Sequence, residues 1–364
     1  MKTSTQVGTL ALLIAAMALV GCSDAQEEVV DEPSDDAQVI TLSYAFFAPA
    51  QSFPAIQMEH WAKELNERTD GRVEVDLFPG GSLLTASNMY DGVLNGVADI
   101  GLSATSYEPG RFPLINLAGS LTGQDVNSDV ASRMTYQLIQ EFGDQMPELE
   151  EFKVITAFTS EPAYFQTIEP IRQLEDLNGL EIRISGDNSR ALDALGVTAV
   201  GMSQADAGEA LQSGIIDGYA ASREVLMDMQ FARLAKYVTD YPLTNTIFAA
   251  LMSREKWEAL PADIQAVIEE LAPEMAAFTG QYLDEHIQRS LEWAQKEEGV
   301  EVIALDDDEA SRWDDQLAPV NETILSDAEQ QGLPAYAFAE RMRELIESRG
   351  DSRLRARHWP IRYQ

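Results

Sequence analysis

The feature that most constrains the fold is a long run of apolar residues at helical spacing in the C-terminal half. After Trp257 and Leu260, apolar side chains recur every three or four residues to about Gln295, with Pro261 in the first turn. Roughly thirty residues at about 1.5 Å each give a helix of about 50 Å, which is longer than one ordinary domain is wide. We therefore expect a helix that lies along two domains, with a kink near Pro273.

The rest of the chain alternates between strand-like and helix-like segments. Residues 39–44 and 73–77 alternate with period two, whereas 54–65 and 125–142 carry apolar residues at helical spacing. This alternation favours an α/β fold, and 364 residues suggest two domains. Further strands and helices are predicted at 86–95, 99–102, 152–158, 164–167, 180–184, 188–195, 198–200, 204–212, 215–219, 246–251, 308–331 and 334–348.

The charge balance limits the class of partner. The chain has 61 acidic and 25 basic residues, a formal net charge of -36. Nucleic acid is excluded as a partner, because binding phosphates requires clustered Lys and Arg. The one basic stretch is the tail 349–364, which could pair with the acidic body, contact lipid headgroups or remain solvated.

The N-terminus has the pattern of an export signal. Lys2 is followed by a short apolar run, too short to span a bilayer, and the run ends at Cys22. Residues 1–22 resemble a bacterial lipoprotein signal peptide, in which this cysteine is lipidated. Residues 23–38 are acidic and aperiodic, which predicts a disordered tether. We therefore expect a periplasmic protein anchored to a membrane through Cys22, the only cysteine, which excludes disulfides and thiol catalysis.

Motifs of catalysis and metal binding are missing. The chain has no G-x-S-x-G, no G-x-x-x-x-G-K-[ST] and no H-E-x-x-H, and its three histidines share no spacing. Asp306 begins an acidic run that lacks the glycine of a calcium loop. The sequence predicts neither an enzyme nor a metal or cofactor site.

Arg183 lies in a predicted strand whose two faces differ. Leu180, Ile182 and Ile184 share one face, so that Glu181 and Arg183 share the other. The pattern alone is compatible with a solvated arginine.

Motifs around this strand resemble the substrate-binding proteins of tripartite ATP-independent periplasmic (TRAP) transporters. Residues 176–218 match a D-x-x-G-x-x-x-R strand, an A-L-G turn and an A-L-x-x-G-x-x-D-G segment, in that order. Further matching segments lie at 78–83, 94–101, 106–113, 257–261 and 332–335. Their order and spacing over about 40–348 carry the resemblance.

The resemblance implies a fold like that of type II periplasmic-binding proteins, with a ligand cleft between two α/β lobes and a long helix spanning both. Lobe I would comprise 39–158 plus about 251–285, and lobe II 159–250 plus about 286–348. It also implies that Arg183 clamps the carboxylate of the ligand. A guanidinium offers a planar fork that meets both carboxylate oxygens.

The chain departs from the family pattern at two places. No arginine lies in 161–165, where some members carry a second one, and no asparagine follows Gly218 closely. These losses favour a monocarboxylate with a more apolar body, and Arg223 or Asn245 could replace the missing polar contacts. The candidate walls, each equally compatible with core packing, are Tyr164, Tyr219, Phe47 and Tyr107.

The resemblance implies that the protein delivers a small organic acid to integral-membrane TRAP subunits. The alternative is a sensing subunit that uses the same fold to report the ligand to a membrane receptor.

Overall fold

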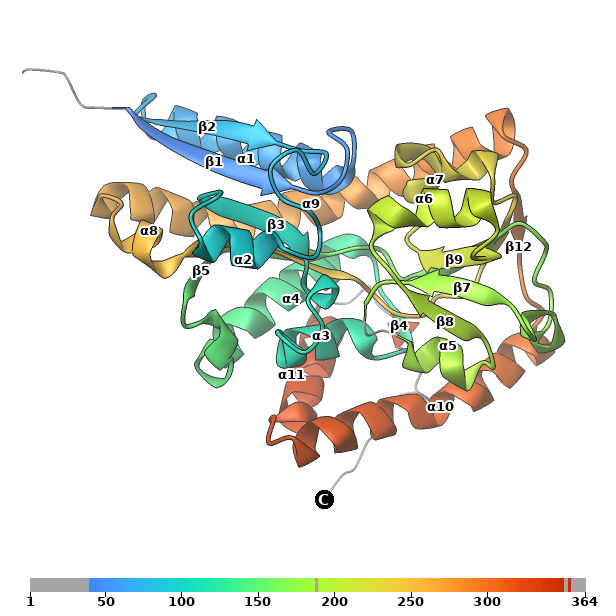
Figure 1. Ribbon diagram of the computed structural model, residues 1–364. Coiled ribbons are helices and arrows are strands. Elements are labelled where there is room, and N and C mark those ends of the chain that lie inside the picture. Colours follow the sequence, from blue (N-terminus) through green and yellow to red (C-terminus); the bar gives the residue numbers. More distant parts are fainter. Residues whose placement is uncertain (1–38, 187–188, 350–352, 355–364) are drawn as a thin grey trace, which may run out of the picture. The chain divides into compact units, whose positions relative to one another are not determined.

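The computed structural model describes residues 39–186, 189–349 and 353–354 (Figure 1). The predicted signal peptide, Cys22 and the acidic tether lie outside the described residues, as does most of the basic tail. The described chain contains two large sheets with helices packed around them, which confirms the predicted α/β class.

The first sheet has five strands in the order β2-β1-β3-β11-β5. Strand β1 (Ile40–Phe46) pairs in parallel with β2 (Val73–Phe78) and β3 (Ile100–Ala104). Strand β11 (Ile247–Ser253) comes from much later in the chain and lies antiparallel between β3 and β5 (Phe152–Thr159). Its first six residues are buried, as expected for a strand in the middle of a sheet.

The second sheet has six strands in the order β12-β10-β6-β9-β7-β8. Its central part is mixed, because β7 runs parallel to β8 and β9, whereas β6 runs antiparallel to β9 and β10. The strands are β6 (Tyr164–Thr167), β7 (Glu181–Ile184), β8 (Thr198–Gly201), β9 (Gly218–Ala221), β10 (Tyr237–Thr239) and β12 (Glu301–Ile303).

The predicted long helix is confirmed as α9 (Ala262–Glu297), which has 36 residues and is about 54 Å long (Figure 1). It contacts β5 and helix α1 (Phe53–Arg68) beside the first sheet, and α7 (Val225–Asp228), which follows β9 of the second. The helix begins later than predicted. Pro261 is its N-cap, and the preceding residues form a separate short helix, α8 (Arg254–Glu258).

The other helices follow the predicted pattern with small differences at their ends. Helices α3 and α7 were not predicted, because both are short, with eight and four residues. The remaining helices are α2 (Met89–Leu94), α3 (Pro113–Ser120), α4 (Ser128–Phe142), α5 (Arg190–Ala194), α6 (Gln204–Ser213), α10 (Asp307–Gln330) and α11 (Ala335–Ser348). No helix among the described residues is both long enough and apolar enough to cross a membrane.

The predicted strand at 215–219 is wrong at its start. Gly214 adopts a left-handed conformation that ends α6, and β9 begins only at Gly218. A backbone bond from Asp217 N–H to the Glu181 carbonyl, 2.8 Å long, leads the chain into the sheet.

Helix α11 packs against α4 and α3, which belong to the surroundings of the first sheet. We therefore propose that it joins lobe I, although the sequence placed 286–348 in lobe II.

Two chain segments cross between the sheets and are hydrogen-bonded to each other. One joins β5 to β6 and the other joins β10 to β11. The Ser160 N–H donates to the Thr246 carbonyl at 2.9 Å, and the Ala163 N–H donates to the Thr244 carbonyl at 2.6 Å. These bonds satisfy part of the backbone polar groups of the two segments.

Candidate ligand-binding site

Arg183 lies in the middle of the second sheet. Its strand β7 pairs with β8 and β9, so that Arg183 is opposite Val200 and Tyr219. Arg183 is 0% exposed, and its side chain is one of the largest that the described structure buries completely.

All described hydrogen-bond partners of the Arg183 guanidinium are neutral. Its Nε donates to the Met202 carbonyl at 3.0 Å, Nη1 to Gln204 Oε1 at 2.5 Å and Nη2 to the Tyr107 hydroxyl at 2.9 Å. Among the described residues no ion pair involves this guanidinium. A buried guanidinium whose described partners are all neutral is costly, so this position favours an anion.

Tyr107 connects the two sheets at this point. It follows β3 of the first sheet, and its hydroxyl accepts hydrogen bonds from Arg183 Nη2 and, at 2.9 Å, from the backbone N–H of Gln204. The Tyr107 ring meets the Phe47 ring edge-on, with 5.3 Å between centroids. Two of the predicted wall residues are thus brought together with Arg183.

Two cavities meet at this aromatic pair. The larger has a volume of about 740 Å³ and lies between Gly81 and Ser106 on one side and Met202 and Ser203 on the other. The smaller has a volume of about 50 Å³. Phe47 and Tyr107 line both cavities. Arg183 itself lines neither cavity, but its partners do: Tyr107 and Met202 line the larger one, and Tyr107 and Gln204 line the smaller one.

The smaller cavity is largely aromatic with a few polar groups. Five rings line it: Phe46, Phe47, Phe53, Tyr107 and Phe248. The polar part of the wall consists of the Gln204 amide and the hydroxyl and carboxyl groups of Ser160, Ser185, Ser222, Thr246 and Glu224. The other lining residues are apolar: Ala48, Pro54, Ala221, Val225 and Met229. Such a wall suits an apolar body that carries a few polar groups.

Gly186 permits a close approach between the two sides of the larger cavity. Its φ is +48°, and a Cβ at this position would lie 1.9 Å from the Ser106 carbonyl oxygen. Any side chain here would separate the second sheet from the segment that carries Tyr107.

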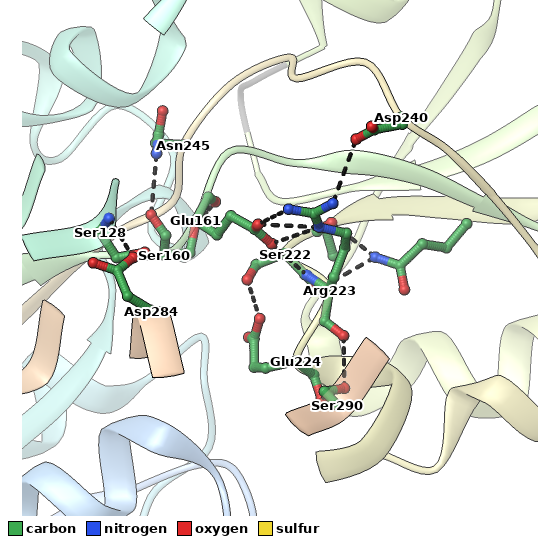
Figure 2. Close-up of polar contacts among 12 residues, drawn as sticks. Ser128, Ser160, Glu161, Ser222, Arg223, Glu224, Asp240, Asn245, Asp284 and Ser290 are labelled. Atoms are coloured by element: carbon green, nitrogen blue, oxygen red, sulfur yellow. Dashed lines mark hydrogen bonds and ion pairs between the residues drawn. The ribbon is translucent and has the colours of Figure 1, made fainter. Parts of the chain in front are cut away.

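The structure places Arg223 and Tyr164 in a different group. Figure 2 shows the contacts of Arg223 with Glu161 and Asp240. Arg223 is held by the buried carboxylate of Glu161 through its backbone N–H at 3.0 Å, through Nε at 3.0 Å and through Nη2. Its guanidinium lies 3.9 Å from the centroid of the Tyr164 ring, and Asp240 is 3.4 Å away. Burial raises the pKa of Glu161 even against the opposing effect of Arg223.

These residues face another cavity, of about 470 Å³, which Arg223, Tyr164, Glu161 and Asp284 help to line. Neither Arg223 nor Tyr164 lines the two cavities beside Arg183. Their predicted ligand contacts receive no support from this arrangement.

Tyr219 and Asn245 also lie away from the cavity walls. The Tyr219 hydroxyl donates to Gln166 Oε1 at 2.9 Å, and its ring packs edge-on against Phe231. Asn245 Nδ2 donates to the Ser160 carbonyl at 3.0 Å, so this residue helps to join the two crossing segments (Figure 2).

Sequence reasoning missed Gln204 and Glu224. Gln204 is the first residue of α6, directly after β8 and its short connection, and this position at a strand end was an available signal. Glu224 follows the named Arg223, but nothing in the sequence distinguishes which of the two faces the cavity. Among the described residues no group of three or more His, Cys, Asp or Glu side chains could hold a metal ion.

Two sheets joined by crossing segments, with a buried arginine whose partners line a cavity, are the arrangement expected of a solute-binding protein. The comparison with known families is consistent with this class. Residues 44–327 match the model of the bacterial extracellular solute-binding protein family 7, and the chain belongs to that family.

Similar proteins extend the family assignment. The chain is 22% identical to the C4-dicarboxylate-binding protein DctB of Bacillus subtilis, over 94% of this chain and 98% of the relative. It is 39% identical to a TRAP periplasmic solute-binding protein of Desulfovibrio salexigens, with a TM-score of 0.74 over 85% of this chain and 97% of the other. The resemblance to TRAP solute-binding proteins is thus confirmed, and the family consists of solute-binding proteins rather than enzymes.

Another similar structure is a TRAP solute-binding protein of Rhodoferax ferrireducens in complex with copurified benzoate. Its TM-score is 0.80 at 24% identity, over 85% of this chain and 98% of the other. At this identity the similarity concerns the fold.

Proposed function

We propose that this protein captures a small organic carboxylate at Arg183 and delivers it to the membrane subunits of a TRAP transporter. The observation that carries the proposal is the buried guanidinium of Arg183, whose described partners are all neutral. A ligand carboxylate that replaced the Tyr107 hydroxyl and the Gln204 amide would supply the missing negative charge with two charge-assisted hydrogen bonds.

The same contacts support closure around the ligand. Tyr107 comes from the first sheet and Arg183 from the second, so an anion held between them would draw the two sides together. A ligand shifts such an equilibrium by its difference in affinity for the open and closed states. Delivery then requires that the transporter distinguish the closed state.

The binding step is tested with Arg183→Met, which keeps the length of the side chain and removes its charge. Calorimetry with a carboxylate identified by a thermal-shift screen should show affinity at least about tenfold weaker, a loss of about 1.4 kcal/mol or more. The control is Arg172→Met, because Arg172 is exposed and paired with Glu301. Unchanged affinity in a folded Arg183→Met protein would refute the clamp.

Delivery has its own measurement. Cells that contain the membrane subunits should take up the labelled acid only when this protein is present, and uptake independent of the protein would favour a sensing role.

We also propose that the mature chain is lipid-anchored through Cys22 on the outer side of the cytoplasmic membrane or at the outer membrane. Labelling with radioactive palmitate should be lost in Cys22→Ser, and label retained in that variant would contradict the anchor.

A further inference from the structure

The smaller cavity contains an acidic side chain that the capture of an anion does not require. Among the residues that line this cavity, Glu224 is the only acidic one, and it is 4% exposed. Buried charges in proteins are normally paired, so an acid in the wall of a carboxylate site needs an explanation.

The surroundings of Glu224 supply no cation in the described part of the chain. Its carboxyl is in a short hydrogen bond with the Ser222 hydroxyl (Figure 2). The neighbouring Arg223 is bound to Glu161 and Asp240, and the following Asp228 is held by His286 at 2.6 Å. Glu224 therefore faces the cavity without a basic partner among the described residues.

The position of this carboxyl is fixed by helix α9. Ser290 Oγ donates to the Arg223 carbonyl at 2.9 Å and to the Glu224 carbonyl at 3.3 Å, which fastens the backbone on both sides of the Glu224 side chain (Figure 2). Burial, with smaller contributions from Asp228 and Glu161, raises the pKa of Glu224 to about 8. The carboxyl at neutral pH thus favours a bound proton or a donor group from a ligand.

The hydrogen-bond partners of Arg183 share the smaller cavity with Glu224. The Arg183 partners Tyr107 and Gln204 line it, and so does Glu224. The same cavity is lined by aromatic rings, including Phe53 and Phe248, whose centroids are 5.6 Å apart. At about 50 Å³ this cavity is smaller than one that holds an aromatic ring. A ligand held by its carboxylate at Arg183 would therefore have to widen it to place its body against these rings and a further polar group toward Glu224.

Building on the proposed function, we infer that Glu224 determines specificity by binding an O–H or N–H donor on an aromatic acid whose carboxylate is held by Arg183. The donor can be a neutral hydroxyl, which either form of the carboxyl can accept, or a cationic ammonium, which requires the ionised carboxylate. The hydroxyl and the ammonium each offer a hydrogen-bond donor to the same acceptor, the Glu224 carboxyl.

The test compares three probes that differ only in this group. Calorimetry at pH 7 measures the affinity of the full protein for benzoate, 3-hydroxybenzoate and 3-(aminomethyl)benzoate. We expect at least one of the donor-bearing acids to bind about tenfold or more tightly than benzoate. If the ammonium acid is preferred, its affinity should rise from pH 6 to pH 8, whereas a preferred hydroxyl acid should not show this rise.

Variants of Glu224 assign the preference to this residue. In Glu224→Leu the ratio between the affinities for the donor-bearing acid and for benzoate should fall below about threefold. Glu224→Gln should keep most of a hydroxyl preference, and Glu209→Gln, on the exposed face of α6, should change nothing.

The outcomes separate this inference from the proposed function. Equal affinity for all three acids, a preference that persists in Glu224→Leu, or binding of aliphatic acids alone would overturn the inference and leave the clamp standing. A wild type that binds no carboxylate, or an Arg183→Met protein with unchanged affinity, would overturn both.

Discussion

The buried pair of Arg223 and Glu161 decides whether Arg223 is a structural residue or a ligand contact. We consider Arg223→Met, Glu161→Gln and the double variant. The side chains are only 14% and 8% exposed, so each variant leaves a buried polar group with its main partner removed. The structure predicts a loss of stability in each single variant and little loss of ligand affinity.

The expected magnitude follows from the contacts. Removal of one partner of a buried pair costs about 3–5 kcal/mol, and Arg223 also loses its position over the Tyr164 ring. Glu161 can reduce this cost by binding a proton, because burial already raises its pKa. In the folded Arg223→Met protein the Glu161 carboxyl then keeps its proton. In the unfolded chain the same carboxyl releases its proton once the pH exceeds the ordinary pKa of a glutamate. Its stability, relative to wild type, should therefore fall as the pH rises from 5 to 8.

The assay is equilibrium unfolding in urea at both pH values, followed by calorimetry with the ligand. Coupling in the double-mutant cycle should exceed about 1 kcal/mol, the upper end for exposed pairs. A matched cycle on Arg172 and Glu301, which are 54% and 49% exposed, should stay below that value. If Arg223→Met keeps wild-type stability but weakens ligand binding as much as Arg183→Met does, the structural role is wrong.

Two further predictions concern Glu224 and Gly186. Because burial raises the pKa of Glu224 to about 8, from an ordinary value near 4.5, the folded state holds a proton that the unfolded chain loses. The free energy of unfolding contributed by this group thus decreases as pH rises between those values, and Glu224→Gln should gain up to about 4 kcal/mol on wild type from pH 5 to pH 8 in urea unfolding. Parallel pH profiles would contradict this. Gly186→Ala should weaken binding of the acid about tenfold or more in calorimetry, since its Cβ would meet the Ser106 carbonyl. Gly179→Ala is the control, with φ +81° and open space around its Cβ, and equal losses in both would show that strain alone is responsible.

Much of the fold was predictable because its signals are local. The apolar spacing of α9 and the strand patterns of β1, β2 and β7 require no knowledge of distant residues. The start of α9 was misplaced because Trp257 and Leu260 continue the apolar spacing across Pro261, whereas the helix hydrogen bonds do not.

The residues of the site also fall into two groups, those that local patterns identify and those whose role depends on distant partners. Arg183 and Tyr107 were identified through motifs, and their hydrogen bond joins residues 76 positions apart. The roles of Arg223 and Tyr164 depend on Glu161, which is 62 positions from Arg223 and carries no local sign of this pairing. Sequence patterns could nominate these side chains, but only the packing of β6, β9 and α9 shows which cavity each one faces.

The paired crossing segments restrict how the two sheets can move. Bonds at Ser160 to Thr246 and at Ala163 to Thr244 make the two segments a single ribbon of backbone. Sliding one sheet past the other would break these hydrogen bonds, whereas bending the two segments together would keep them. Opening should therefore follow one rotational path. A transporter subunit of the kind proposed above would then have only two arrangements, open and closed, to distinguish along that path.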